Sequence, residues 1–82
     1  MTRKEIMDVV IGIMQDVMTE VDCSTIEDTE LPFSNMMEMD SMDFLDVVMA
    51  LQRKYAIEIP DEDFPHLKSM KSTVDYLEAK LK

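Results

Sequence analysis

The sequence predicts an all-α protein, a four-helix bundle with a long first loop and a short third helix. Its 82 residues contain one glycine and three prolines, whereas β-sandwiches and barrels need many turn residues. Apolar residues recur at helical spacing in three segments, and a polar stretch rich in turn-forming residues separates the first two. A chain of this length is enough for one small domain, which we take to span residues 1–82.

The first helix has a defined beginning. Thr2 and Glu5 form the T-x-x-E pattern of a capping box, in which each side chain accepts a hydrogen bond from the backbone N–H of the other residue. The apolar residues that follow have the spacing of one helix face: Ile6, Val10, Ile13 and Val17. We expect this helix to end near Thr19–Val21.

Residues 22–39 predict a long connection, since they are rich in serine, threonine, aspartate, asparagine and proline. Loops of this length are uncommon in compact domains and are often functional. We expect the aromatic ring of Phe33 to anchor the connection to the core.

The second helix is predicted to run from about Ser41 to Lys54, with Asp40 as its N-cap. The acidic run 61–63 then predicts a short third helical turn, which Pro65 limits. A last helix is expected from Met70 to Leu81. Ser69 is its predicted N-cap. Its buried stripe consists of Met70, Val74, Leu77 and Leu81.

The second helix carries two apolar faces. The face expected in the core contains Phe44, Val47, Val48, Leu51 and Tyr55. The opposite face contains Met42, Leu45 and Met49, beside Asp46 and Arg53. A surface helix needs only one apolar stripe, and flexible methionines adapt to several partners, so we predict that the second face docks partner proteins. The alternative is a central helix that is buried on two sides.

The net charge of −10 limits the classes of partner. Such a chain repels nucleic acid and anionic membranes and attracts basic protein surfaces, although solubility alone could also explain the charge. The single cysteine excludes an internal disulfide and suits a reducing compartment. No apolar run approaches the roughly 20 residues of a membrane span. We therefore expect a cytoplasmic monomer without membrane insertion.

Neither catalysis nor metal binding has support in the sequence. Cys23 and His66 could form a thiol–imidazole pair, but no local motif brings them together, so Cys23 is expected to be a passive loop thiol. The acidic run 61–63 lacks the central glycine of a calcium-binding loop, because Gly12 is the only glycine in the chain. We predict no catalytic residue and no metal site.

Ser41 opens the second helix, where its hydroxyl would lie beside free backbone N–H groups and the positive end of the helix dipole. This is a suitable position for a phosphate group. A serine at the start of a helix is more often only a cap. The residues alone leave both interpretations open.

Three blocks of sequence resemble the acyl carrier protein family, which is phosphopantetheine-dependent. The run from Met39 to Leu51, with Asp-Ser-Met near its start, resembles the segment of the family to which phosphopantetheine is attached. Residues 57–63 resemble the following loop and third helix of the family, and residues 74–78 resemble its last helix. Phe33 lies where the family has a loop anchor. The resemblance covers nearly the whole chain.

The resemblance implies a carrier function. A phosphopantetheinyl transferase would transfer 4′-phosphopantetheine from coenzyme A to Ser41, with Asp40 helping to position that enzyme. The chain would then carry acyl or aminoacyl groups as thioesters between loading and synthase enzymes that have basic docking patches, in fatty-acid, polyketide or related biosynthesis, and would itself catalyse nothing. The alternative is an acidic helical interaction module that never carries the arm.

Several positions depart from the family pattern. Glu38 replaces a usual glycine, Met42 replaces the commoner leucine, and residues 52–54 replace late glutamates with Gln-Arg-Lys. Phe44 replaces a smaller residue beside the expected acyl cavity, and Ala56 replaces a glycine suited to a left-handed cap. These departures indicate a specialised carrier rather than the housekeeping one.

Overall fold

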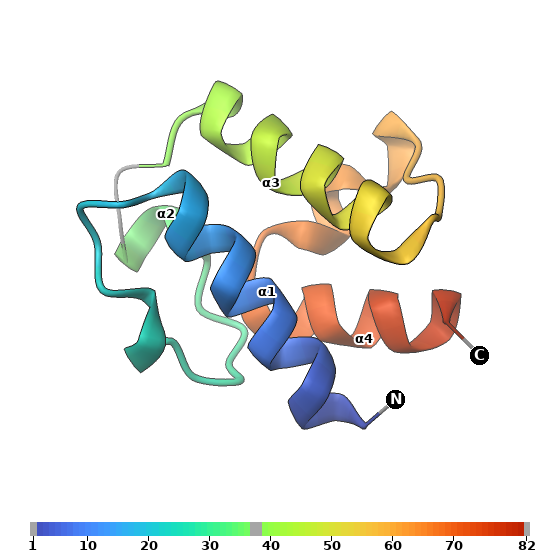
Figure 1. Cartoon of the computed structure of the whole chain (residues 1–82), viewed down its shortest axis with the longest axis horizontal. Helices are drawn as coiled ribbons and strands as arrows, with labels where there is room; N and C mark the ends of the chain where they lie inside the picture. Colours follow the sequence, from blue (N-terminus) through green and yellow to red (C-terminus); the bar gives the residue numbers. More distant parts are fainter. Residues whose placement is uncertain (1, 37–38, 82) are drawn as a thin grey trace.

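The computed structural model describes residues 2–36 and 39–81 and confirms an all-α fold (Figure 1). These residues form four α-helices and two 3-10 helices. In chain order they are α1 (Arg3–Val17), η1 (Cys23–Thr25), α2 (Phe33–Met36), α3 (Ser41–Tyr55), η2 (Asp61–Leu67) and α4 (Met70–Lys80). The short third helix of the predicted bundle is the 3-10 helix η2. No helix in the described ranges is long and apolar enough to cross a membrane.

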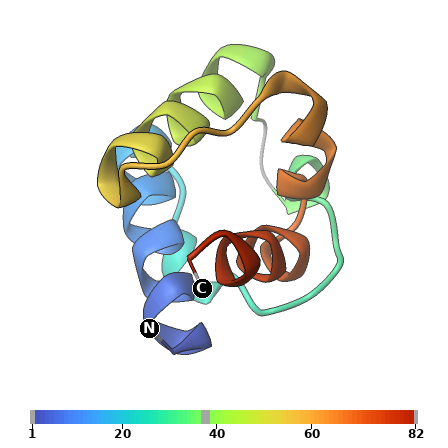
Figure 2. The same cartoon turned by 90° about the vertical axis from the view of Figure 1, so that its right-hand side faces the viewer.

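Four of these elements surround one core (Figure 2). α1 packs on α3 and on α4, and η2 packs on α4. The rings of Phe64 on η2 and Phe44 on α3 pack edge to face, with centroids 5.6 Å apart, so η2 also contacts α3. The fully buried side chains of the described chain come from α1, η1, α3 and α4: Ile6, Val10, Met14, Cys23, Val48, Leu51, Met70, Thr73, Val74 and Leu77.

The caps read from the sequence are present. The hydroxyl of Thr2 accepts a hydrogen bond from the backbone N–H of Glu5 at 3.2 Å, and the Glu5 carboxylate accepts one from the N–H of Thr2. Ser69 begins α4 as predicted, in a capping box with Ser72. α1 ends at Val17, earlier than expected, because Met18 leaves the helical region of backbone space (φ −108°, ψ 67°).

The connection 22–39 is more ordered than expected, since it contains η1 and the one-turn helix α2. Phe33 anchors it as predicted, with only 5% of its surface exposed. Its backbone N–H donates a hydrogen bond to the carbonyl oxygen of Lys68 at 2.8 Å, beside a β-bridge between Pro32 and Ser69. The segment before α3 is therefore fixed to the segment before α4.

Pro65 does not limit the third helix, contrary to the expectation from sequence. It lies inside η2, which continues to Leu67. A proline removes one N–H donor and clashes with the carbonyl four residues earlier in an α-helix. In a short 3-10 helix hydrogen bonds join residues three apart, so the clash with the carbonyl four residues earlier does not end the helix, and Pro65 only omits one hydrogen bond.

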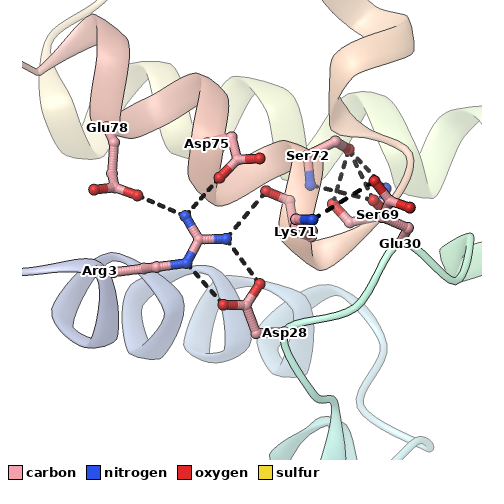
Figure 3. A network of polar contacts seen from close by, with 8 residues as sticks. All are labelled: Arg3, Asp28, Glu30, Ser69, Lys71, Ser72, Asp75 and Glu78. Carbon is pink, nitrogen blue, oxygen red and sulfur yellow. Dashed lines mark hydrogen bonds and ion pairs between the residues drawn. The ribbon is translucent and has the colours of Figure 1, made fainter.

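Arg3 joins α1 to α4 and to the first connection (Figure 3). Its guanidinium contacts carboxylate oxygens of Asp28 at 2.7 Å and of Asp75 and Glu78 at 2.6 Å each. These contacts raise the pKa of Arg3 and lower that of Asp28 below its ordinary value. The network lies between the α1 and α4 ribbons, and no residue of α3 takes part in the contacts drawn there.

Candidate functional site

Ser41 is the first residue of α3 and is exposed. Asp40 caps the helix: its carboxylate accepts a hydrogen bond from the N–H of Asp43 at 2.8 Å, and its carbonyl oxygen accepts one from the N–H of Phe44 at 3.0 Å. The backbone N–H groups of Ser41 and Met42 have no hydrogen-bond acceptor in the described chain. An exposed hydroxyl thus lies beside two free donors at the positive end of a helix dipole.

A pocket of about 210 Å³ opens beside Ser41. Three elements and their flanking residues line it: Phe33, Met39, Asp40, Ser41, Phe44 and Lys68. Phe44 lines the pocket, and its ring forms a T-shaped pair with that of Phe64. The Phe44 side chain therefore forms part of the pocket wall.

Lys68 is the pocket residue that sequence reasoning missed. Its Nζ lies 4.3 Å from the centroid of the Phe44 ring, within the range of a cation–π contact. Lys68 comes after η2 and resembles an ordinary linker lysine in sequence. Its proximity to α3 follows from the packing of η2 across the bundle, and no local motif indicates it.

The second apolar face of α3 is exposed to solvent. The exposed fractions are 73% for Met42, 43% for Leu45 and 53% for Met49, and Asp46 and Arg53 are exposed beside them. On the opposite face Val47, Val48 and Leu51 are buried, whereas Phe44 and Tyr55 are only half-buried. The alternative of a helix buried on two sides is therefore wrong, and the stripe is available for contact with another molecule.

This exposed stripe borders a surface depression of about 470 Å³ between α1 and α3. Its lining combines apolar side chains with charges of both signs: Ile13, Asp16, Val17, Asp46, Met49, Ala50 and Arg53. The depression extends the accessible apolar surface from α3 onto α1.

Ala56 has the left-handed conformation expected at this position, with φ 53° and ψ 46°. Its N–H donates to the carbonyl oxygen of Gln52, and the N–H of Ile57 donates to the same oxygen at 3.1 Å. Glu38, a further departure from the family pattern, lies outside the described residues.

Cys23 was expected to be a passive loop thiol, and its surroundings fit an unreactive group. It lies in η1, is fully buried, and its backbone N–H donates to the side-chain oxygen of Gln15 at 2.9 Å. Burial and the charge of Asp22 raise the pKa of the thiol. His66 is exposed and stacks on Tyr76, with ring centroids 5.9 Å apart. Within the described ranges, no three His, Cys, Asp or Glu residues are grouped to hold a metal ion.

Comparison with known proteins identifies the family. The family described as the phosphopantetheine attachment site matches residues 8–77. An acyl carrier protein of Thermosynechococcus vestitus is 31% identical over 81 residues, which cover 99% of this chain and 98% of that protein. An acyl carrier protein of Helicobacter hepaticus is 44% identical over 50 residues, which cover 61% of this chain and 66% of that protein. The chain belongs to the acyl carrier protein family.

Members of this family are non-catalytic carriers whose cofactor is phosphopantetheine, and the chain has that carrier role. The groups around Ser41 fit a phosphate. They comprise an exposed hydroxyl, two free backbone N–H donors and the ammonium of Lys68 on the same pocket. The alternative of an interaction module without the arm is not favoured.

Proposed function

We propose that Ser41 is the residue that bears the 4′-phosphopantetheine arm. The observation that carries this proposal is the exposed Ser41 hydroxyl at the start of α3, beside the free N–H groups of Ser41 and Met42 and at the mouth of a pocket. An attached phosphodiester would be stabilised there by the helix dipole and by hydrogen bonds from the backbone. A phosphopantetheinyl transferase would supply the arm from coenzyme A.

The residues around Ser41 have separate tasks in this proposal. The Ser41 oxygen becomes bonded to the phosphorus next to the pantetheine as the pyrophosphate bond of coenzyme A breaks. Adenosine 3′,5′-bisphosphate leaves, and the hydroxyl proton passes to a base of the transferase. Asp40 fixes the first turn of α3 through its hydrogen bond to the N–H of Asp43, and so presents Ser41 to the transferase in one orientation. The bound arm supplies a terminal thiol that holds acyl or aminoacyl groups as thioesters. The chain contributes position and surface, and the chemistry belongs to its partner enzymes.

The proposed docking surface is the exposed face of α3, formed by Met42, Leu45, Asp46, Met49 and Arg53. Its apolar side chains are unusually exposed for a monomer, and apolar surface of this kind commonly marks an interaction site. The net charge of −10 favours encounter with basic patches on loading and synthase enzymes. We propose that these encounters occur in the cytoplasm. We also propose that the chain is monomeric and that residues 1–82 form a single carrier domain.

We further propose that the chain is a specialised carrier. Arg53 and Lys54 are exposed at the end of α3, where housekeeping fatty-acid carriers often have glutamates. Positive charge there weakens attraction to a basic partner. Loading by a fatty-acid synthase malonyl transferase should therefore be slower than loading of a housekeeping carrier, and equal rates would contradict this part of the proposal.

Intact-mass measurement tests the attachment site. Incubation with coenzyme A and a broad-specificity phosphopantetheinyl transferase should add about 340 Da, the mass of the arm. Ser41→Ala should abolish the addition, whereas Ser24→Ala, a control at another exposed serine, should load fully. Loading of Ser41→Ala, or no loading of the wild type when a control carrier is loaded, would overturn the proposal.

A further inference from the structure

The backbone and the side-chain ammonium of Lys68 each make a contact that holds the residue beside Ser41. Its carbonyl oxygen accepts the hydrogen bond from the N–H of Phe33, which sets its backbone against α2. Its ammonium lies over the ring of Phe44 on α3 at 4.3 Å. Lys68 and Ser41 line the same pocket of about 210 Å³. The packing therefore directs one positive charge to the place where the arm begins.

This charge has no carboxylate partner in the described part of the chain. By contrast, the described structure pairs Arg3, Lys4 and Lys71 with carboxylates. The missing ion pair does not by itself set Lys68 apart, because Arg53, Lys54 and Lys80 also lack a carboxylate partner in the described structure. Lys68 differs from them in lining the pocket beside Ser41. The contact with the Phe44 ring leaves the donors on the outer side of the ammonium available to an anion.

The group that can reach this ammonium with least rearrangement is the phosphodiester of the arm. It would be bonded directly to the Ser41 oxygen, so it stays near the pocket mouth whichever way the rest of the arm points. Phe44 is three residues after Ser41, and residues at this spacing are neighbours on one helix surface, about 5–6 Å apart at Cβ. Ser41 and Phe44 are therefore neighbours on α3, and Lys68, whose ammonium lies over the Phe44 ring, lines the same pocket.

On the basis of the proposed function, we infer that Lys68 binds the phosphodiester of the arm on Ser41. The free N–H groups of Ser41 and Met42 are the other donors to the same anion. Lysine binds phosphate as a point charge, and the contact offsets the repulsion between the phosphodiester and the nearby carboxylates of Asp40 and Asp43. Lys68 is thus a positioning residue for the arm.

This contact determines the direction of the arm. With its phosphodiester held on the Lys68 side, the arm leaves Ser41 along the pocket rather than along the exposed stripe of Met42, Leu45 and Met49. Phe33 and Phe44 supply the apolar walls of the pocket along which the first part of the arm would lie.

Phosphorus NMR of the loaded protein tests the contact. The ³¹P resonance of the arm is compared in wild type, Lys68→Gln, Lys68→Arg and Lys54→Gln, where Lys54 is an exposed control lysine on α3. We expect Lys68→Gln to move the resonance toward its position in the urea-unfolded loaded protein, while the other two variants keep the wild-type position. In the wild type, about 0.5 M salt should produce the same movement, because screening weakens an exposed ion pair.

The alkylation rate of the arm's terminal thiol by a neutral reagent gives a second readout, with mass spectrometry to locate the adduct. Lys68→Gln should react about 2- to 5-fold faster, the range that an exposed ion pair supplies. An unchanged resonance and rate in Lys68→Gln would overturn the inference, as would a wild-type resonance insensitive to salt. Failure of Ser41 to load is a different result and would reject the proposed function itself.

Discussion

The phenol hydroxyl of Tyr76 on α4 donates a hydrogen bond of 2.7 Å to a carboxylate oxygen of Asp63 on η2. His66, also on η2, stacks on the same ring. Burial, the hydrogen bond and the charge of Asp63 raise the pKa of Tyr76 to about 12. η2 has no side-chain cap at its start, so this contact is a principal polar attachment of η2 to the bundle.

Tyr76→Phe should lower the free energy of unfolding by about 1 kcal/mol, because it removes one hydrogen bond and keeps the ring. The contribution also depends on pH. The pKa of Tyr76 is raised on folding, so its stabilisation is complete below the ordinary value of 10 and is lost as the pH rises toward 12. Urea unfolding at several pH values between 7 and 11.5 measures both effects.

Tyr55 provides an internal reference for this experiment, since burial raises its pKa as well and it remains in the variant. The difference between wild type and Tyr76→Phe isolates Tyr76. That difference should shrink as the pH rises above 10. A difference that stays constant to pH 11.5 would show that the hydrogen bond does not control the titration of Tyr76.

Arg3→Gln should destabilise the fold by about 1 kcal/mol, since three carboxylates lose their common partner. The side chains are about one third exposed or more, so solvent limits the effect. The hydrogen bond from Arg3 lowers the pKa of Asp28, and the associated stability is present above the ordinary value of 3.8 and is lost as the pH falls below it. The variant should lose less stability than the wild type on acidification.

Lys4→Gln is the matched control for this prediction. Among the described residues Lys4 forms one longer ion pair, of 3.5 Å, with Asp8 on the same helix, and both side chains are largely exposed. Thermal unfolding of the two variants at neutral pH should show a clear decrease in Tm for Arg3→Gln and almost none for Lys4→Gln. Equal decreases in Tm would mean that the Arg3 network of Figure 3 stabilises the fold no more than the single exposed ion pair of Lys4.

Ala56→Gly should stabilise the protein by about 0.5–1 kcal/mol. Ala56 has the left-handed conformation, which costs a residue with Cβ roughly 1–2 kcal/mol, and glycine adopts it without this cost. The greater chain entropy of glycine in the unfolded state offsets part of the gain. Chemical denaturation of Ala56→Gly should give a higher midpoint with an unchanged m-value. A lower midpoint would contradict the assignment of strain to this position.

The helix beginnings could be predicted because their signals are local. A cap and the N–H group that it binds are three residues apart, so Thr2, Asp40 and Ser69 are readable from a few letters of sequence. Helix ends were predicted less accurately. α1 ends at Val17 because Met18 changes its backbone conformation, and no capping residue marks that point.

The position of Ser41 could be inferred, but the pocket beside it could not. Phe33, Phe44 and Lys68 come from three separate segments, and only the packing of η2 on α3 and of Lys68 on α2 brings them together. Pro65 illustrates the same difficulty. A rule derived for α-helices predicted a short turn, whereas the chain adopts a 3-10 helix there.

Leu45→Ala and Met49→Ala should reduce the rate of phosphopantetheine transfer to Ser41 without reducing stability. Both side chains are about half exposed, so the fold gains little from them, whereas an apolar contact at a docking centre is worth more than 1 kcal/mol. We expect kcat/KM of the transferase to fall about 5- to 10-fold for each variant. Loading followed by intact mass measures the rate, and urea unfolding measures the stability.

Leu31→Ala is the control for this pair. Leu31 is 47% exposed, close to the 43% of Leu45, but it precedes α2 rather than lying on α3. If loss of exposed apolar area alone slowed the transferase, all three variants would be slowed alike. A wild-type rate for Leu31→Ala, together with slow loading of Leu45→Ala and Met49→Ala, would place the contact on the exposed face of α3, where flexible methionines can adapt to more than one partner.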